Sequence, residues 1–415
     1  MVVELVVRDL KLLKPIKTIL ENEGLFVKPI YSEGEDKIIR TRISDSNHQL
    51  LESLGTGVLV REIDGPVIQS HTKNDITEFT RHFFEGKLEN ATVIKLLEVL
   101  PVKYTVFPPL LLFNYSKQRS FLNELWQQTV PSELMDQFYQ AMLSAPFLAN
   151  KKVSHIATNM PIIESDVMRR PFNIVPLYGF KNSIPNEDKI WDSPSAQDFQ
   201  DALWCQVNQN GIEQVWAPQF TMFSRGNIKE KKRILDTFTD IEGNDVVDMY
   251  SGIGYFTLSY LTRNARTVFA FELNPWSVEG LKRGLKANRI DQNRCHIFNE
   301  SNANCLTRIK EYASIHGPPH IRHINLGLLP SSRDGWPLAV QLYRYQLQFS
   351  TDRITIHIHE NVHIDHIRDN SFIANTVAQL QEIDSELTYT PTHLEQIKTF
   401  APDVWHICLD VDIDH

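Results

Sequence analysis

The chain has 415 residues, of which 42% are hydrophobic, and its 42 Lys or Arg against 51 Asp or Glu give a net charge of −9. This length predicts two or three domains, and the composition excludes a collagen, a coiled-coil rod and a wholly disordered chain. A surface that is basic all over is excluded too, whereas an enzyme acting on nucleic acid needs only a local basic face. Without an apolar run long enough for a membrane span or a secretory start, we expect no membrane contact and a cytoplasmic location.

The four cysteines lie far apart in the sequence and form no CxxC pair. This spacing disfavours a zinc cluster and does not imply a disulfide framework. We expect four free, buried thiols in a reducing compartment.

The first half of the chain gives weak signals. Residues 1–108 have a mixed α/β pattern, in which Asp64-Gly65 between two apolar runs predicts strand, turn and strand. Pro108-Pro109 interrupts regular structure and suggests a domain boundary. Residues 117–145 follow with a helical pattern, and 153–195, with five prolines, are expected to be rich in loops.

The segment 212–225 is expected to form short strands that stop at Pro218. Asn227 and Glu230 then have the spacing of a capping box, in which a short polar side chain precedes a glutamate by three residues. The sequence therefore predicts a helix beginning at about residue 228, with its apolar residues on one side.

From residue 245 the pattern alternates between strand and helix. The predicted order is strand, helix, strand, helix and two later strands, at Asp245–Asp248, Tyr255–Leu261, Thr267–Glu272, Ser277–Arg289, His320–Asn325 and Arg353–His359. This order predicts an open, Rossmann-like α/β sheet.

The most informative local pattern is a strand that ends in Asp248 and continues through Gly252 and Gly254 into a helix. Glycines allow the backbone to approach a ligand closely, and Glu272, at the end of the next strand, can accept both hydroxyls of a ribose. Thr257 stands where a dinucleotide motif has its third glycine. An acid before the turn suits a cationic ligand such as S-adenosylmethionine; a tight turn without a ligand is the alternative.

The stretches SRGNIKEK (224–231), DMYSGIGYFTL (248–258) and FELNPWSVEGLKRGLKAN (271–288) resemble the class I S-adenosylmethionine enzymes that modify the purine 3′ of the tRNA anticodon. Methyltransferases of that group carry Asn-Pro-Pro after the fourth strand. This chain has Asn325-Leu-Gly-Leu-Leu-Pro330 instead, which is similar to the tRNA wybutosine-synthesising protein 2 family. The resemblance covers roughly 150–370.

The resemblance implies transfer of the 3-amino-3-carboxypropyl group of S-adenosylmethionine to C7 of 4-demethylwyosine at position 37 of phenylalanine tRNA, with release of methylthioadenosine. The implied fold class is α/β: a C-terminal Rossmann-like class I S-adenosylmethionine-dependent domain with smaller α+β N-terminal domains. We predict an α/β domain over 1–108 without an assigned role, an RNA-positioning α+β domain over 109–223 and the catalytic domain over 224–415. No obligate protein partner is expected.

The same resemblance assigns roles to individual residues. Ser224 and Lys231 would hold the amino-acid arm, and Glu272 the ribose. Where the family has Gly-Asp-Asn for the adenine, this chain has Glu300-Ser301-Asn302, so that Ser301 is a weaker acceptor than an acid. The predicted cofactor-binding set is Ser224, Lys231, Asp248, Tyr250, Gly252, Glu272, Ser301 and Asn302, and the predicted wall of the base pocket is Asn325 and Pro330.

Basic residues are concentrated in one part of the chain. Residues 222–294 hold twelve Lys or Arg and nine Asp or Glu, whereas 295–415 hold eight and fifteen. The predicted RNA contacts are Arg169, Arg170, Arg225, Lys229, Lys232 and Arg233, with ordinary solvated side chains as the alternative. Trp191, Trp216 and Phe223 are candidates for stacking on a base, although core packing is the simpler explanation for each.

His357 and His359 share one face of a predicted strand. We expect surface or packing histidines there and predict no metal. The sequence does not identify the group that accepts the C7 proton, although His359 and Glu360 are candidates. Two other functions stay open: a guanine-37 tRNA methyltransferase on the same fold, and a non-catalytic tRNA-binding relative.

Overall fold

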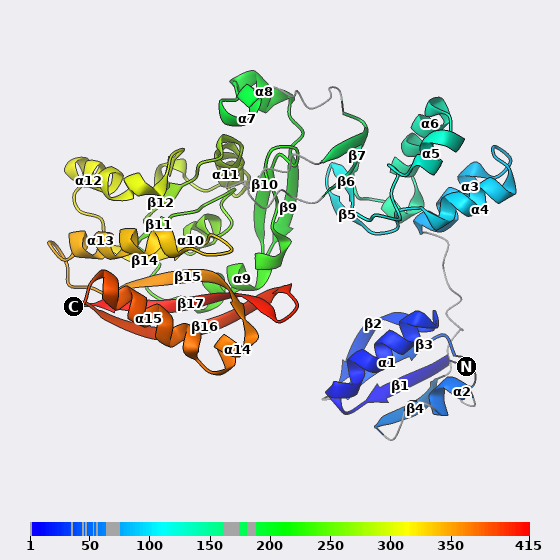
Figure 1. Ribbon diagram of the computed structural model, residues 1–415, viewed down its shortest axis with the longest axis horizontal. Helices are drawn as coiled ribbons and strands as arrows, with labels where there is room; N and C mark the ends of the chain where they lie inside the picture. Colours follow the sequence, from blue (N-terminus) through cyan, green and yellow to red (C-terminus); the bar gives the residue numbers. More distant parts are fainter. Residues whose placement is uncertain are drawn as a thin grey trace. The chain divides into compact units, whose positions relative to one another are not determined.

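The computed structural model describes residues 2–34, 36–43, 45, 48–52, 54, 57–63, 75–160, 174–180 and 188–415. The chain divides into two compact units, the first comprising 1–98 with 145–147 and the second 99–144 with 148–415 (Figure 1). Over the described ranges, no helix has the length and apolar character needed to cross a membrane.

The first unit contains a four-stranded antiparallel sheet with the strand order β2-β3-β1-β4. Alternate residues Val3, Leu5 and Val7 of one strand pack against Ile16 and Leu20 of an amphipathic helix. The elements are β1 (Val2–Val7), α1 (Leu10–Asn22), β2 (Phe26–Glu33), β3 (Asp36–Thr41), α2 (Gln49–Glu52), β4 (Val58–Ile63), α3 (Ile76–Phe84) and α4 (Asn90–Glu98). The predicted turn at Asp64-Gly65 lies outside the described residues.

The second unit begins with a small sheet of order β5-β6-β7-β8. Its first two strands form a hairpin in which Phe107 pairs with Leu110, so Pro108-Pro109 is a turn within one sheet. The boundary between the two compact units lies after Glu98 instead. The elements up to the second hairpin are β5 (Tyr104–Phe107), β6 (Leu110–Phe113), α5 (Glu124–Thr129), α6 (Ser132–Leu143), β7 (His155–Thr158), β8 (Val175–Tyr178), α7 (Asp188–Asp192), α8 (Ala196–Asp201), β9 (Cys205–Gln209) and β10 (Ile212–Trp216).

A seven-stranded sheet forms the rest of the second unit, and it confirms the predicted open α/β fold (Figure 1). Its strand order is β13-β12-β11-β14-β15-β17-β16, and the first five strands in this order are parallel. The strands are β11 (Asp245–Asp248), β12 (Thr267–Phe271), β13 (Cys295–Phe298), β14 (Ile321–Leu326), β15 (Ile354–His363), β16 (Thr388–Ala401) and β17 (Val404–Asp414). The helices are α9 (Ile228–Thr237), α10 (Thr257–Thr262), α11 (Pro275–Ala287), α12 (Cys305–His316), α13 (Trp336–Gln346), α14 (Ile364–Arg368) and α15 (Ser371–Ile383).

Both faces of this sheet are covered, which explains why every residue of β11 and β12 is buried. Val246 packs with Leu281 of α11 in one core cluster. The next residue, Val247, points to the opposite face and packs with Trp336 of α13 in another. The four cysteines are free and buried, as expected.

The strand order reverses at β11, which lies between β12 and β14. In open α/β sheets, the crevice beyond the carboxyl ends of the strands at such a reversal is where ligands bind. The loops that follow β11, β12, β13 and β14 therefore position the candidate site.

Candidate active site

The turn after β11 places a backbone N–H against the carboxylate at the end of β12. Gly252 and Gly254 have φ angles of +54° and +87°, which glycine adopts without steric cost. A Cβ at Gly254 would lie 2.5 Å from Leu281 Cδ1, so α11 packs directly on this turn. The resulting shape lets the Gly252 N–H donate to Glu272 Oε2 at 2.8 Å.

Glu272 accepts two hydrogen bonds from the protein. Its second oxygen, Oε1, accepts from the Asn274 N–H at 2.8 Å. Burial raises the pKa of this half-buried carboxyl group, and the two backbone donors partly oppose that rise. An ionised carboxylate can accept about four hydrogen bonds. Glu272 therefore keeps acceptor capacity for other donors, such as two ribose hydroxyls.

A cavity of about 480 Å³ opens at this edge of the sheet. Six of the eight predicted cofactor residues line it: Ser224, Tyr250, Gly252, Glu272, Ser301 and Asn302. Other residues that line the cavity had no role assigned from the sequence, including Leu273, Glu300, Leu329, Lys398 and Phe400. Lys398 and Phe400 come from β16, more than a hundred residues from the glycine turn, so no local spacing could have indicated them.

Ser224 precedes α9 and is held by its own neighbourhood. Its N–H donates to the Tyr255 hydroxyl at 3.1 Å, and its Oγ donates to Asn227 Oδ1 at 3.2 Å. The expected capping box is wrong, because Asn227 accepts this hydroxyl and its side chain makes no cap bond to the helix. Glu230 instead bonds Arg233.

The loop after β13 supplies an acid one residue earlier than the family pattern. Glu300 lines the cavity and accepts from Arg308 Nε at 2.5 Å and from Asn304 at 2.8 Å. The hydrogen bond from Arg308 lowers the pKa of Glu300. Ser301 Oγ accepts from the Ala303 N–H at 3.2 Å, and Asn302 Nδ2 donates to the Met249 carbonyl at 3.3 Å.

Asp248, predicted to face a cationic ligand, is fully buried and does not line the cavity. Its carboxylate accepts from Thr257 Oγ1 at 2.6 Å and from Asn325 Nδ2 at 2.9 Å. Burial raises its pKa. Asp248 and Asn325 thus join β11 to β14 behind the turn. Asn325 and Pro330, predicted to form a wall of the base pocket, do not line this cavity, whereas Gly327 and Leu329 of the same segment do.

Lys231 lies behind the cavity wall instead of within it. Its ammonium donates to Gln209 Oε1 at 2.7 Å and to Gln214 Oε1 at 2.6 Å, and lies 5.1 Å from the centre of the Tyr255 ring. The side chain is 1% exposed, so it is not the solvated lysine considered as the alternative either. Burial lowers its pKa to about 7. The structure thus gives Lys231 no direct access to an amino-acid arm.

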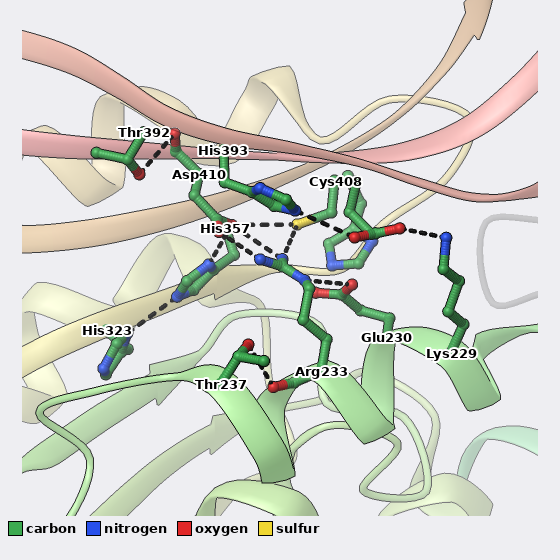
Figure 2. A network of polar contacts seen from close by, with 12 residues as sticks. Lys229, Glu230, Arg233, Thr237, His323, His357, Thr392, His393, Cys408 and Asp410 are labelled. Atoms are coloured by element: carbon green, nitrogen blue, oxygen red, sulfur yellow. Dashed lines mark hydrogen bonds and ion pairs between the residues drawn. The ribbon is translucent and has the colours of Figure 1, made fainter.

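Arg233, predicted to bind RNA, is part of a buried ion-pair network (Figure 2). Its guanidinium donates to Glu230 Oε1 at 2.6 Å and to Asp410 Oδ2 at 2.5 Å. Only 10% of the side chain is exposed. The prediction was wrong because α9 turns this arginine toward β17, where the buried carboxylates of Glu230 on α9 and Asp410 on β17 need a cation.

Histidines extend the same network beneath the sheet (Figure 2). The Nδ1 of His357 lies 2.7 Å from Asp410 Oδ1, and its Nε2 lies 3.0 Å from His323 Nδ1. Burial lowers the pKa of His323 to about 3, and its Nε2 donates to the Thr239 carbonyl at 2.8 Å. His357 therefore links Asp410 of β17 to His323 of β14.

Two groups of buried side chains, Glu230–His359–Cys408 and His357–Cys408–Asp410, have possible metal-ligand atoms within 4.8 Å of one another. The Arg233 guanidinium already neutralises both carboxylates, which argues against a metal ion there. Neither of the two candidates for the C7 proton lines the cavity. His359 contacts His406 at 2.9 Å, and the Glu360 carboxylate accepts from Ser331 and Ser332.

The other RNA candidates have different surroundings. Arg225 is exposed and lines both the main cavity and a second one of about 240 Å³. Lys229 pairs with Glu395 of β16, and Lys232 is exposed beside Asp236 at 2.7 Å. Arg169 and Arg170 lie outside the described residues.

The three aromatic candidates separate into two kinds. Trp191 and Trp216 are buried in core clusters. Phe223 stacks on Trp216, with 4.2 Å between ring centroids, and lines both cavities. Trp216 also lines the second cavity, and Phe223 is the one of the three that lines the main cavity.

Comparison with known proteins agrees with this architecture. A model of the TRM5/TYW2 methyltransferase domain matches residues 206–307. Among solved structures, P. horikoshii TYW2 in complex with MeSAdo has a TM-score of 0.53 at 19% identity, covering 82% of this chain and 99% of that one. Trm5b from Pyrococcus abyssi has a TM-score of 0.50 at 15% identity, covering 100% of both chains. At these identities the structures show a shared fold.

Sequence relatives are much closer. The chain is 48% identical to tRNA wybutosine-synthesizing protein 2 of Saccharomyces cerevisiae, in an alignment that covers 100% of this chain and 98% of that protein. It is 36% identical to the protein of the same name in Schizosaccharomyces pombe, covering 79% and 77%. The glycine turn and Glu272 lie inside the matched methyltransferase domain. The protein therefore belongs to the tRNA wybutosine-synthesizing protein 2 family.

Proposed function

We propose that this protein transfers the 3-amino-3-carboxypropyl group of S-adenosylmethionine to C7 of 4-demethylwyosine at position 37 of phenylalanine tRNA. The observation that carries the proposal is the meeting of the Gly252 N–H and the Glu272 carboxylate at the strand reversal, inside a cavity of about 480 Å³. Nearly half of the residues match the yeast protein along the whole chain.

The residues that line the cavity suit an adenosine with a charged arm. Glu272 accepts hydrogen bonds from the ribose hydroxyls, and the exposed side chain of Leu273 offers an apolar surface for the adenine. Tyr250 and Asn302 lie on neighbouring loops and limit the orientations that the adenine ring can adopt. Ser224, on the loop before α9, is placed for the amino-acid arm.

The chemistry requires orientation more than acid catalysis. The carbon–sulfur bond to the arm breaks as the bond to C7 forms, and C7 then loses its proton to a base. The departing thioether is neutral, so it needs no proton. Alignment of the two reacting carbons can supply about 7–11 kcal/mol in favourable cases. Which of the sulfonium's three carbons reacts therefore depends on how the cavity holds the arm.

The tRNA acceptor belongs to the same proposal. The exposed Arg225 at the cavity is placed to contact a phosphate of the anticodon loop, and residues 109–223 would position that loop. A solved complex of aTrm5 with tRNALeu has the same fold, with a TM-score of 0.50. The free, buried cysteines suit a cytoplasmic location for the enzyme.

The test uses S-adenosylmethionine labelled either in the methyl group or in the carboxyl group, with tRNA from cells blocked just before this step. Carboxyl label in the tRNA is the expected result. Methyl label would instead identify a guanine-37 methyltransferase. No transfer of either label and no S-adenosylmethionine binding by calorimetry would identify a non-catalytic relative.

A further inference from the structure

Lys398 is a cation in the main cavity whose counter-ion is missing from the described part of the chain. It lies on β16, is half-buried and lines the cavity. Across the described ranges, its ammonium makes no hydrogen bond and no ion pair. By contrast, Lys229 pairs with Glu395, and Arg233 pairs with Glu230 and Asp410.

The tip of Lys398 rests on the loop that carries Ser224. A Cβ at Gly226 would lie 2.5 Å from Lys398 Nζ and 2.4 Å from its Cδ. Any larger residue at position 226 would displace the ammonium, so this glycine makes room for it. The lysine thus reaches the segment to which the amino-acid arm is assigned, although the two segments are far apart in the sequence.

The cavity's other charged groups are engaged differently. The Glu300 carboxylate is paired with Arg308, and Glu272 is held by two backbone donors. The guanidinium carbon of Arg225 lies 5.6 Å from the centre of the Phe107 ring, and Phe107 lines the second cavity. Arg225 lines both cavities, whereas Lys398 lines the main cavity and not the second one, so its ammonium is available to an anionic group bound in the main cavity.

We infer that Lys398 binds the carboxylate of the 3-amino-3-carboxypropyl arm and so fixes which carbon of the sulfonium faces the acceptor base. The inference rests on the proposed function and replaces the role first assigned to Lys231, whose ammonium is enclosed by two glutamines. Burial lowers the pKa of Lys398, and a bound carboxylate would offset that burial. A half-buried position inside the cavity suits a ligand carboxylate better than a tRNA phosphate on the outer surface.

The test compares three ligands by calorimetry on the full-length protein: S-adenosylmethionine, its decarboxylated analogue and methylthioadenosine. For Lys398→Met we expect affinity for S-adenosylmethionine to fall about 10- to 100-fold, as for a lost charge-assisted hydrogen bond. Affinities for the decarboxylated analogue and methylthioadenosine should stay within about twofold, because neither ligand has the carboxylate. Lys398→Arg should recover part of the loss.

Lys286→Met, on the exposed side of α11, is the matched control and should leave all three affinities unchanged. Equal weakening of all three ligands by Lys398→Met would show a structural role and overturn the inference. Loss of tRNA affinity with unchanged S-adenosylmethionine affinity would assign the lysine to a phosphate and also overturn it. If the unaltered protein transferred only methyl label or bound no S-adenosylmethionine, the proposed function itself would fail.

Discussion

Two groups of charged side chains in the second unit differ in whether groups of the protein pair with them. Around Arg233, the carboxylates of Glu230 and Asp410 and the imidazole of His357 are buried and pair with one another (Figure 2). Around the cavity, Glu272 is held by backbone donors and Lys398 has no counter-ion among the described residues. Charges that are already paired hold elements together, whereas charges with unused bonding capacity are available to a ligand.

The largest expected effect comes from breaking the paired group. Arg233→Met would leave two carboxylates buried without their cation, and removing one partner of a buried ion pair costs about 3–5 kcal/mol. We expect the free energy of unfolding, measured in urea, to fall by about that amount. The folded fraction should bind S-adenosylmethionine normally, because Arg233 does not line the cavity.

Lys232→Met is the matched control, since Lys232 pairs with Asp236 on the exposed surface. Its effect on stability should be below about 1 kcal/mol. If Arg233→Met cost no more than this control, the network would not join α9 to β17 in the way described.

The second expected effect concerns the cavity. Glu272→Ala removes the acceptor of the ribose hydroxyls, and hydrogen bonds to a charged group contribute about 1.5–3 kcal/mol. Calorimetry should therefore show S-adenosylmethionine affinity about 10- to 100-fold lower, with a smaller change in melting temperature than Arg233→Met produces. Unchanged affinity would remove Glu272 from the ribose site.

Glu272 also predicts a dependence on pH. Because burial raises its pKa, the folded protein binds more protons than the unfolded chain between the unfolded and the raised pKa. Stability from this group therefore declines as pH rises through that window, and Glu272→Gln should remove the decline. In the unaltered protein, S-adenosylmethionine affinity should weaken as pH falls through the raised pKa of Glu272. The glutamine variant should lack this pH dependence.

The smallest expected effect separates Asp248 from Glu272, although both acids end neighbouring strands. Asp248→Asn places an amide where the carboxylate accepts from Thr257 and Asn325, so one donor faces another. We expect a stability loss of about 1–3 kcal/mol in urea unfolding. S-adenosylmethionine affinity should change less than in Glu272→Ala; a larger change would return Asp248 to the ligand site.

The sequence was sufficient for the features that depend on neighbouring residues. The apolar strands, the positive-φ turn at Gly252 and the acid twenty residues beyond it follow local rules, and the structure confirms them. The resemblance carried by these stretches was sufficient for the family. The boundary suggested at Pro108-Pro109 was less reliable, because two prolines suit the turn of a hairpin as well as the end of a domain.

Which charged residue faces the ligand was decided only by tertiary structure. Lys231 and Arg233 belong to one short helix, and their direction depends on what packs against it: two glutamines enclose the first, and β17 carries the partner of the second. Lys398 enters the cavity because β16, at the far edge of the sheet, reaches the loop at Gly226. A sequence pattern states that a charge exists, but burial and the partners brought by distant strands determine whether that charge is free to bind.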